Sequence, residues 1–478
     1  MMDEVKKQNA EQNAGQNEEQ NSGMQENAFK DNKLGTQPVG RLLIGLALPA
    51  IAAQLINLLY NAVDRIYIGH IPGEGSDALT GLGFTLPVII LISAFASLVG
   101  AGGAPKAAIA IGKGDHDTAE EILGNCFSAL ILVALLLSVF FFIFAEPVLK
   151  AFGASADTMP YAFSYLRIYV LGTVFVLITT GMNAFITSQG FAMTAMKTTM
   201  IGAGINLILD PIFIYGFSMG VEGAAVATII SQAISASWVV LFLTGKKTIL
   251  KIKKKNLKIK PAVMGSVMAL GISPFIMQST ESLLSICFNT SLVKYGGDIA
   301  VGAMTILGSV MQATMLPIHG MSQGMTPIIS YNYGAKQMDR VRKAFTTTLI
   351  ISLTYTAIMW AAAMFVPHLL AGIFTPDEEL ISYCSWAMRI YMGGMCIFGA
   401  QIACQQTFVA MGKAVQSLFL AALRKLILLI PLIYIIPCFT ENKVFGIFLA
   451  EPVSDVLAVL ATVTLFRLTV WKMLKGEK

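Results

Sequence analysis

Charged residues are scarce in this chain, and that scarcity indicates its broad class. Only 13% of its 478 residues are Asp, Glu, Lys or Arg and 55% are hydrophobic, whereas charged residues make up about 25% of a typical soluble domain. Apolar runs approach the roughly 20 residues that a helix needs to cross a bilayer, where only helices and closed barrels can pair all their backbone groups. The composition therefore excludes a soluble protein and predicts an all-α polytopic membrane protein.

Motifs for metals, disulfides and nucleotides are missing as well. The six cysteines form no CxxC pair and the four histidines have no ligand spacing, so neither a disulfide nor a metal site is predicted. No GxxxxGK[ST] loop occurs, because the Gly-Lys pairs at 112–113, 245–246 and 412–413 lack the upstream glycine. We therefore expect no enzyme activity and no cofactor, with an ion gradient in place of ATP as the energy source.

The N-terminal stretch contains few apolar residues. Residues 1–37 are rich in Asn, Gln, Glu and Lys, so they cannot bury enough surface to offset the entropy lost on ordering and are predicted to be disordered. They contain no short apolar core with a cleavage site, which argues against a signal peptide. The first apolar run begins after Arg41 and is predicted to be the first span.

What the chain does contain is an internal duplication. Arg167-Ile168-Tyr169 recurs as Arg389-Ile390-Tyr391, which lies 222 residues later. The same spacing relates Phe152 to Phe374, Pro105 to Pro327, Gly112 to Gly334 and Gly190 to Gly412. Both copies consist of long apolar runs, and secondary transporters are commonly built from two such repeats with the binding site between them. The duplication therefore points to transport.

The apolar runs predict about twelve spans, about six in each copy, of the length that a bilayer requires. They are centred near Gln54, Ile90, Val133, Val174, Asn206, Ser231, Ser279, Met311, Thr354, Ile397, Leu428 and Val456. Because an even number of spans returns each half to its starting side, the copies should be related by a pseudo-twofold axis along the membrane normal. The predicted parts are an N-lobe at 38–243, a basic linker at 244–262, a C-lobe at 263–472 and a tail at 473–478.

Lysine and arginine indicate the orientation. With the N-terminus inside, the cytoplasmic connections carry most of them, including the run from Lys246 to Lys260, while the opposite connections hold acids such as Glu74, Asp157 and Asp298. The positive-inside rule therefore predicts a cell-membrane protein with both termini in the cytoplasm. The linker lysines could also form a patch for anionic lipid or nucleic acid, but loop topology alone explains them, and no nucleic-acid partner is expected.

Few acids lie within the predicted spans, where a charge is costly and usually marks a transport pathway. They are Asp64, Asp210, Glu281, Glu451 and Asp455. Asn206 precedes Asp210 by four residues and Tyr60 precedes Asp64 by four, so each pair shares one helix face. A desolvated carboxylate in such a site can gain and lose a proton near neutral pH, and the same oxygens can hold Na+.

Of the two copies, only the first contains these two aspartates. At the repeat spacing, the positions that correspond to Asp64 and Asp210 hold apolar residues in the second copy. A structural role would tend to recur in both copies, and we therefore expect a cation site in the N-lobe. The alternative is that Asp64 only caps the outer end of its span and pairs with Arg65 or Arg167.

Several of these residues resemble multidrug and toxic compound extrusion (MATE) transporters. The resemblance covers about residues 38–472 and rests on Tyr60-Asn61-Ala62-Val63-Asp64 with Ile68-Gly69, on Asn206-Leu207-Ile208-Leu209-Asp210-Pro211 with Tyr215-Gly216, and on Gly112-Lys113-Gly114. It implies a cation site in the N-lobe, formed by Asp64, Asn206, Asp210 and Thr228, for H+ or Na+. It also implies that Asn183 and Tyr60 lie in the same cavity.

The C-lobe departs from that family's pattern. Some MATE transporters have a second cation site made by a Glu and an Asp; Glu281 matches the first, but the tenth span offers Gln401, Gln405 and Gln406 in place of an acid. The resemblance therefore does not extend to coupling through the C-lobe. Glu281, Gln401 and Gln405 are expected to line the substrate cavity.

The implied activity is multidrug efflux by antiport, in which the lobes rock while H+ or Na+ enters and a lipophilic organic cation leaves. The expected partners are such small organic cations and membrane lipid, and we expect a monomer. An alternative is a flippase or exporter of lipid-linked oligosaccharide with the same duplicated lobes. Such a protein would need a cationic cavity for pyrophosphate, and the acids within the spans argue against it. A channel is disfavoured, since no TVGYG-like run occurs.

Overall fold

The computed structural model describes residues 32–475, and every regular element in that range is helical. The prediction of disorder for residues 1–31 falls outside the described residues. The last part of the predicted tail forms the short helix α2 (Lys33–Thr36) instead. Leu34 in this helix is 1% exposed, and Arg340 donates hydrogen bonds to the backbone oxygens of Leu34 and Gln37 at 3.0 and 2.7 Å. The predicted tail is too long because distant residues, which composition does not reveal, order its end.

The N-terminal half supplies the first group of membrane-spanning helices. They are α3 (Val39–Gly69), α4 (Gly75–Lys113), α5 (His116–Ala151), α6 (Met159–Leu171), α7 (Thr173–Ser188), α8 (Ala192–Pro211) with the π-helix η1 (Ile212–Gly216), and α9 (Gly220–Thr244). Helices α6 and α7 form one bent pair, with 58° between them. A short 3₁₀ turn, η2 (Lys254–Asn256), lies in the linker that follows.

The C-terminal half supplies the second group. They are α10 (Pro261–Gly334), α11 (Met338–Phe365), α12 (Pro367–Gly372), α13 (Glu378–Tyr391), α14 (Met395–Ala410), α15 (Ala414–Ala422), the π-helix η3 (Leu423–Leu429), α16 (Ile430–Phe439), α17 (Lys443–Phe466), the π-helix η4 (Arg467–Trp471) and α18 (Lys472–Lys475). Helices α13 and α14 form a second bent pair, at 51°. The two bends lie at Gly172 and near Gly394, which are repeat copies of each other.

The described residues contain 9 helices that are long and apolar enough to cross a membrane, or 11 if each bent pair is one span. The sequence predicts about twelve spans, and helix α10, which is counted here as a single helix, accounts for the difference. Its 74 residues would extend roughly 110 Å at 1.5 Å per residue, which is far more than one bilayer. Gly297 interrupts it with φ 63° and ψ −162°, a conformation that favours glycine. Helix α10 is therefore two helices that meet at Gly297, each long enough for one span.

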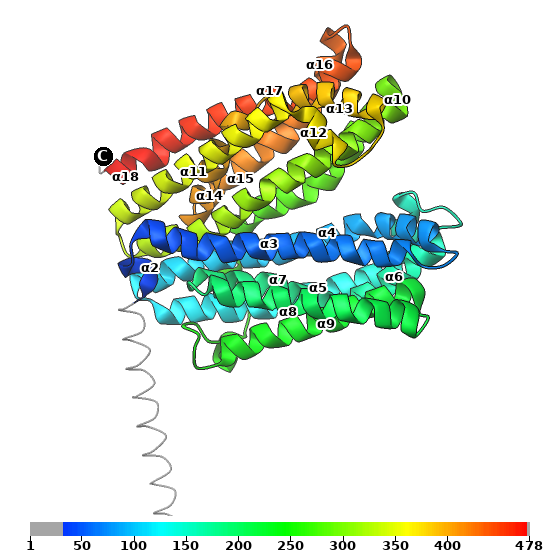
Figure 1. Ribbon diagram of the computed structural model, residues 1–478. Coiled ribbons are helices and arrows are strands. Elements are labelled where there is room, and N and C mark those ends of the chain that lie inside the picture. Colours follow the sequence, from blue (N-terminus) through cyan, green and yellow to red (C-terminus); the bar gives the residue numbers. More distant parts are fainter. Residues whose placement is uncertain (1–31, 476–478) are drawn as a thin grey trace, which may run out of the picture.

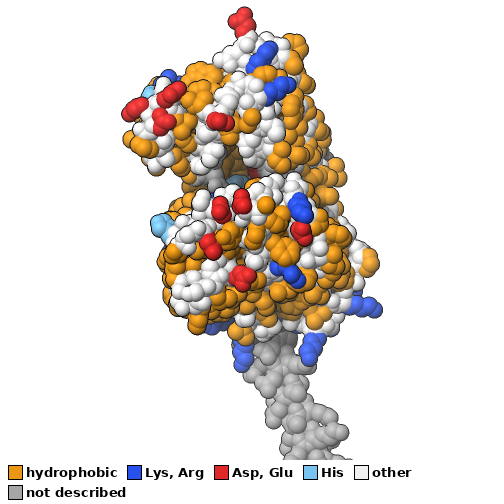
Figure 2. Space-filling model, turned by 90° about the vertical axis from the view of Figure 1, so that its right-hand side faces the viewer, with side chains coloured by type: hydrophobic (Ala, Val, Ile, Leu, Met, Phe, Trp, Pro, Cys, Tyr) orange, Lys and Arg blue, Asp and Glu red, His pale blue; other side chains and the backbone are white. Residues whose placement is uncertain are grey.

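The two halves form two bundles that lie side by side (Figure 1). One hydrophobic cluster fills the N-lobe and continues into C-lobe residues such as Ile328, Phe345 and Phe408, toward the end of the molecule that carries α2 and α18. A second cluster, which includes Phe288 and Met388, belongs to the C-lobe alone. The lobes therefore share a core at one end and separate at the other, where Figure 2 shows a hollow between them.

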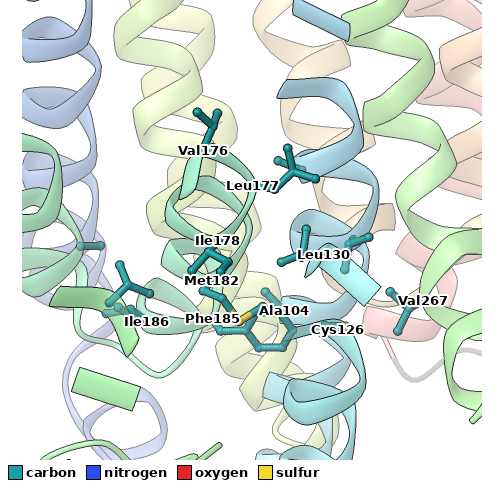
Figure 3. Packing of buried hydrophobic residues seen from close by; sticks show 14 of the residues in the cluster. Ala104, Cys126, Leu130, Val176, Leu177, Ile178, Met182, Phe185, Ile186 and Val267 are labelled. Carbon is teal, nitrogen blue, oxygen red and sulfur yellow. The ribbon is translucent and has the colours of Figure 1, made fainter. Parts of the chain in front are cut away.

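Glycines permit close packing inside the N-lobe. Phe185 of α7 is fully buried beside Cys126 and Ala104 (Figure 3). A Cβ added to Gly103 of α4 would lie 2.7 Å from the Phe185 ring and 2.6 Å from the Cys126 sulfur. The absence of a side chain at Gly103 therefore allows α4, α5 and α7 to meet around this phenylalanine.

Two contacts at the interface between the lobes are copies of each other. A Cβ added to Gly112 of α4 would collide with the carbonyl oxygen of Tyr331 in α10, and a Cβ added to Gly334 of α10 would collide with the carbonyl oxygen of Ile109 in α4. Positions 109 and 331, like 112 and 334, are 222 residues apart, so each contact is the repeat copy of the other. Reciprocal contacts of this kind are what a twofold axis produces.

The basic linker is attached to the N-lobe. Gln189 Oε1, just after α7, accepts hydrogen bonds of 2.8 to 2.9 Å from the Thr248 hydroxyl and from the backbone N–H groups of residues 249 and 250. Lys253 forms an ion pair of 2.6 Å with Glu120 of α5, a carboxylate that is nearly buried. These contacts hold the linker against the N-lobe as it approaches the start of α10.

We expect Gly112→Ala and Gly334→Ala each to destabilise the purified protein, because the added methyl group pushes α4 and α10 apart. Overpacking of this kind typically costs about 1–3 kcal/mol, and thermal unfolding in detergent measures it. Gly83→Ala and Gly308→Ala are matched controls on the same two helices, since an added Cβ there meets no atom within 4 Å. Equal losses of Tm at all four positions would contradict the close approach of the helices.

Candidate functional site

The N-lobe brings two carboxylates together in its interior. Asp64 comes from α3 and Asp210 from the end of α8, and their exposed fractions are 9% and 1%. Asn206, one turn earlier on α8, donates from Nδ2 to Asp210 Oδ1 at 3.0 Å. The carboxyl groups of Asp64 and Asp210 lie close enough to interact electrostatically. The helical spacing of Asn206 and Asp210, together with α3, therefore gathers three polar side chains in one buried site.

Tyrosines surround this pair. The side chain of Tyr60 interacts electrostatically with both carboxylates, and that of Tyr165 interacts with Asp64. The rings of Tyr165 and Tyr169 on α6 stack with their centroids 6.0 Å apart, and both residues are buried. The sequence analysis missed these two residues. Their spacing of four, the same that related Tyr60 to Asp64, is the signal that could have found them.

The carboxylate pair has unused hydrogen-bonding capacity. Asp64 Oδ1 and Asp210 Oδ2 are buried and have no hydrogen-bond partner within the described part of the chain. Two carboxylates in contact cannot both stay ionised without a compensating cation. The site can therefore take up a proton, or a cation that prefers oxygen ligands, such as Na+.

The alternative role for Asp64 is pairing with Arg65 or Arg167, and only one of these arginines acts on it in the structure. Arg65 is the cation that acts on Asp64. Arg167 instead places its guanidinium over the Phe142 ring, at 4.4 Å from the centroid. Arg167 is therefore engaged in a cation–π contact, which leaves Arg65 as the neighbouring charge.

Two other predicted N-lobe residues do not contact the pair directly in any interaction described for them. Thr228 of α9 is half-buried, and its side chain lies next to that of Tyr165, one of the residues close to Asp64. Asn183 of α7 donates from Nδ2 to the backbone oxygen of Ala195 at 3.1 Å, and its Oδ1 is buried with no partner in residues 32–475. Asn183 therefore joins α7 to α8, whereas Thr228 reaches the site through a tyrosine.

The remaining predicted residues lie in the C-lobe, apart from the N-lobe pair. Glu281 of α10 has a side chain that is 61% exposed, and it pairs with Lys425. Gln405 donates to the sulfur of Met277 at 3.2 Å. Gln401 is buried, and its Oε1 has no partner in the described residues. The structure thus divides the predicted set into an N-lobe group and a C-lobe group.

A buried charge network fills the C-lobe beside Glu281. Arg424 donates to Asp455 at 2.9 Å and to Glu451 at 3.1 Å, both on α17, and its guanidinium lies 4.3 Å from the centroid of the Phe398 ring. Lys425, the next residue, turns to α10. Both cations belong to the π-helix η3, a conformation found mostly at functional sites. Two adjacent basic residues in an apolar run were the signal that the sequence analysis did not use.

This fold and these sites define a multi-pass membrane transporter with two duplicated lobes and carboxylates buried in each. The chain belongs to the MatE family, whose sequence profile matches residues 49–212 and 274–435. The matched segments fall in the two lobes. The resemblance to MATE transporters is therefore confirmed, and the chain is a member of a transporter family rather than of an enzyme family.

Relatives of known function agree with this assignment. The chain is 24% identical over 440 residues to the multidrug export protein MepA of Staphylococcus haemolyticus (strain JCSC1435), covering 90% of this chain and 95% of the relative. It is 24% identical over 413 residues to MepA of Staphylococcus aureus (strain NCTC 8325 / PS 47), covering 86% and 89%.

Solved structures show the same fold. An outward-facing multidrug resistance MATE family transporter of the MOP superfamily matches with a TM-score of 0.86 at 21% identity, over 93% of this chain and 99% of that one. A MOP superfamily transporter from Pyrococcus furiosus, described as having a binding pocket of reverse polarity, matches with a TM-score of 0.86 at 22% identity and the same coverage. These matches confirm the predicted all-α architecture.

We expect Arg424→Met to destabilise the protein by about 3–5 kcal/mol, because removal of one partner leaves buried charges uncompensated. Thermal unfolding in detergent measures the loss. The variant Arg424→Met with Glu451→Gln and Asp455→Asn should recover much of it, since no unpaired carboxylate remains. Arg342→Met removes an exposed ion pair with Asp339 and should change stability by at most about 1 kcal/mol. Failure of the triple variant to recover would show that charge compensation is not the role of Arg424.

Proposed function

We propose that this chain exports lipophilic organic cations across the cell membrane by antiport with H+ or Na+. The observation that carries the proposal is the pair Asp64 and Asp210, which is buried, in contact and incompletely hydrogen-bonded. Such a pair is stable when it holds a proton or a cation and less stable when both groups are ionised. That difference is what allows an ion gradient to bias a transporter between two conformations.

The arrangement of the lobes supports alternating access. The lobes share a hydrophobic cluster toward one end and are separated by a hollow at the other (Figure 2). The reciprocal contacts of Gly112 and Gly334 close the end near α2 and α18. In the proposed cycle, Asp64, Asn206, Asp210 and Thr228 bind the coupling ion, and the lobes rock so that the hollow opens to each side in turn.

The relatives and the charge balance support the substrate class. The MepA proteins are multidrug exporters by name, and Tyr60, Asn183, Glu281, Gln401 and Gln405 are proposed to serve the substrate cavity. In the C-lobe, Glu281 is the exposed member of its ion pair and Lys425 the buried one, at 61% and 5% exposure of their side chains. An exposed carboxylate favours cations. The alternative activity, export of lipid-linked oligosaccharide, would instead require cationic side chains to line the substrate cavity.

We expect purified protein in vesicles to move ethidium against its gradient when an ion gradient is imposed, and Asp64→Asn or Asp210→Asn to reduce this transport to the leak rate. Each substitution removes the ionisable group but keeps a side chain of similar size. Asp157→Asn, at an exposed position in the loop between α5 and α6, is the matched control. A pH gradient and a Na+ gradient, applied separately, identify the coupling ion. Normal transport by both variants would refute the assignment, and lipid scrambling without dye transport would favour the flippase alternative.

The proposed orientation has its own test. With both termini in the cytoplasm, a single cysteine at Lys247 should react with an impermeant maleimide only in inverted vesicles or opened cells. A single cysteine at Asp157 should react in intact cells. Both positions are outside the membrane-spanning helices and exposed, so reactivity reports sidedness and not burial. The opposite labelling pattern would invert the proposed topology.

A further inference from the structure

Lys425 holds one turn of α10 at two points. Its Nζ donates to the backbone oxygen of Met277 at 3.0 Å and to the carboxylate of Glu281, four residues later on the same helix. The lysine side chain is 5% exposed, whereas that of Glu281 is 61% exposed. The carboxylate therefore has one side turned to a buried ammonium, while much of its surface stays exposed.

The other two carboxylates of this cluster pair with the neighbouring arginine. Arg424 donates to both Glu451 and Asp455. The described cluster then contains three carboxyl groups and two basic side chains, so one negative charge is left over when all five groups are ionised. Glu281 is its exposed carboxylate, whereas Glu451 and Asp455 are 5% and 2% exposed. The excess charge is therefore accessible only at Glu281.

Two further titratable residues lie near Glu281. His319 of α10 interacts electrostatically with Glu281, Lys425 and Arg424, and the buried Tyr391 lies near Glu451, Asp455 and Glu281. Glu451 also acts on Lys425. The ammonium of Lys425 therefore has a second carboxylate near it, and it keeps the Met277 carbonyl as a fixed partner.

We propose that Lys425 is a tethered cation that competes with the positive charge of the transported molecule for the carboxylate of Glu281. The inference rests on the proposed export of organic cations and names the subsite that selects them. A monovalent lipophilic cation at Glu281 balances the excess charge of the cluster. Because it must take the carboxylate from Lys425, binding is weaker than an isolated buried carboxylate would give.

Weak binding of this kind suits an exporter, because a substrate held too tightly is not released. Competition also makes the subsite selective for charge. A neutral lipophilic molecule gains nothing from Glu281 and does not disturb Lys425, whereas a cation does both. Lys425 is therefore a specificity-determining residue whose effect depends on the charge of the substrate.

The test is equilibrium binding of ethidium to the full chain in detergent, followed by fluorescence anisotropy and without any ion gradient. Lys425→Met removes the competing charge and should tighten ethidium binding about tenfold, which corresponds to about 1.4 kcal/mol. Glu281→Gln should weaken binding, and Glu281→Gln with Lys425→Met should show no gain over Glu281→Gln alone. Nile red, a neutral dye, should bind the wild type and Lys425→Met equally.

Lys443→Met is the matched control, since Lys443 is a C-lobe lysine whose Nζ donates to the backbone oxygen of Thr440 at 3.0 Å. It should leave ethidium binding unchanged. Lys425→Arg retains the charge and should keep binding within a few-fold of wild type. Unchanged or weaker ethidium binding by folded Lys425→Met, or equal tightening for Nile red, would overturn the proposal. If Lys425→Met does not fold, Glu281→Gln decides, because unchanged ethidium binding by that variant overturns the proposal.

These outcomes are separable from those that test the proposed function. Binding is measured at equilibrium, so it does not depend on Asp64 or Asp210 coupling to an ion. A protein that binds ethidium as described but fails to move it under a gradient would refute antiport and leave the subsite standing. A protein that exports ethidium but shows no effect of Lys425→Met would do the reverse.

Discussion

The cost of removing a charge from water governs this structure. A carboxylate within a membrane-spanning helix is expensive unless it is protonated, paired or bound to a cation, and both lobes contain such groups. The C-lobe meets the cost internally, with Arg424 between Glu451 and Asp455 and with Lys425 against Glu281. The N-lobe does so only in part, since Asp210 receives a hydrogen bond from Asn206 and the pair still has two unpartnered oxygens within the described residues.

The two lobes differ in their charges although their backbones are related by an approximate twofold axis. The reciprocal contacts of Gly112 with Tyr331 and of Gly334 with Ile109 show that the backbones of the two copies meet in equivalent ways. Close approach of this kind needs glycine, and it brings α4 and α10 into backbone contact toward the end that carries α2 and α18. The duplication thus supplies two lobes with related backbones. The copies do not share the charged residues of these sites, so each lobe has a polar site of its own.

The anchoring of the linker and of α2 constrains how the lobes can move. Gln189 and Lys253 attach the linker to the N-lobe, and Arg340 attaches α2 to a helix of the C-lobe. The free length of chain between the lobes is therefore shorter than the sequence of the linker suggests. The proposed rocking motion would then bend the chain near Lys260, at the start of α10, and at the junction between α2 and α3.

The sequence by itself determined the class, the duplication and the approximate spans, because each depends on local composition or on a repeated pattern. It also determined the pairing of Asn206 with Asp210, since a spacing of four fixes their relation on any helix. It could not reveal that Asp64 meets Asp210, that Tyr165 and Tyr169 lie beside them, or that Glu281 is paired with Lys425, 144 residues away. Those contacts join separate helices, and only packing decides which faces of two helices meet. For the same reason the tertiary structure alone decided that residues 33–36 are ordered, because their partners lie about 300 residues further along the chain.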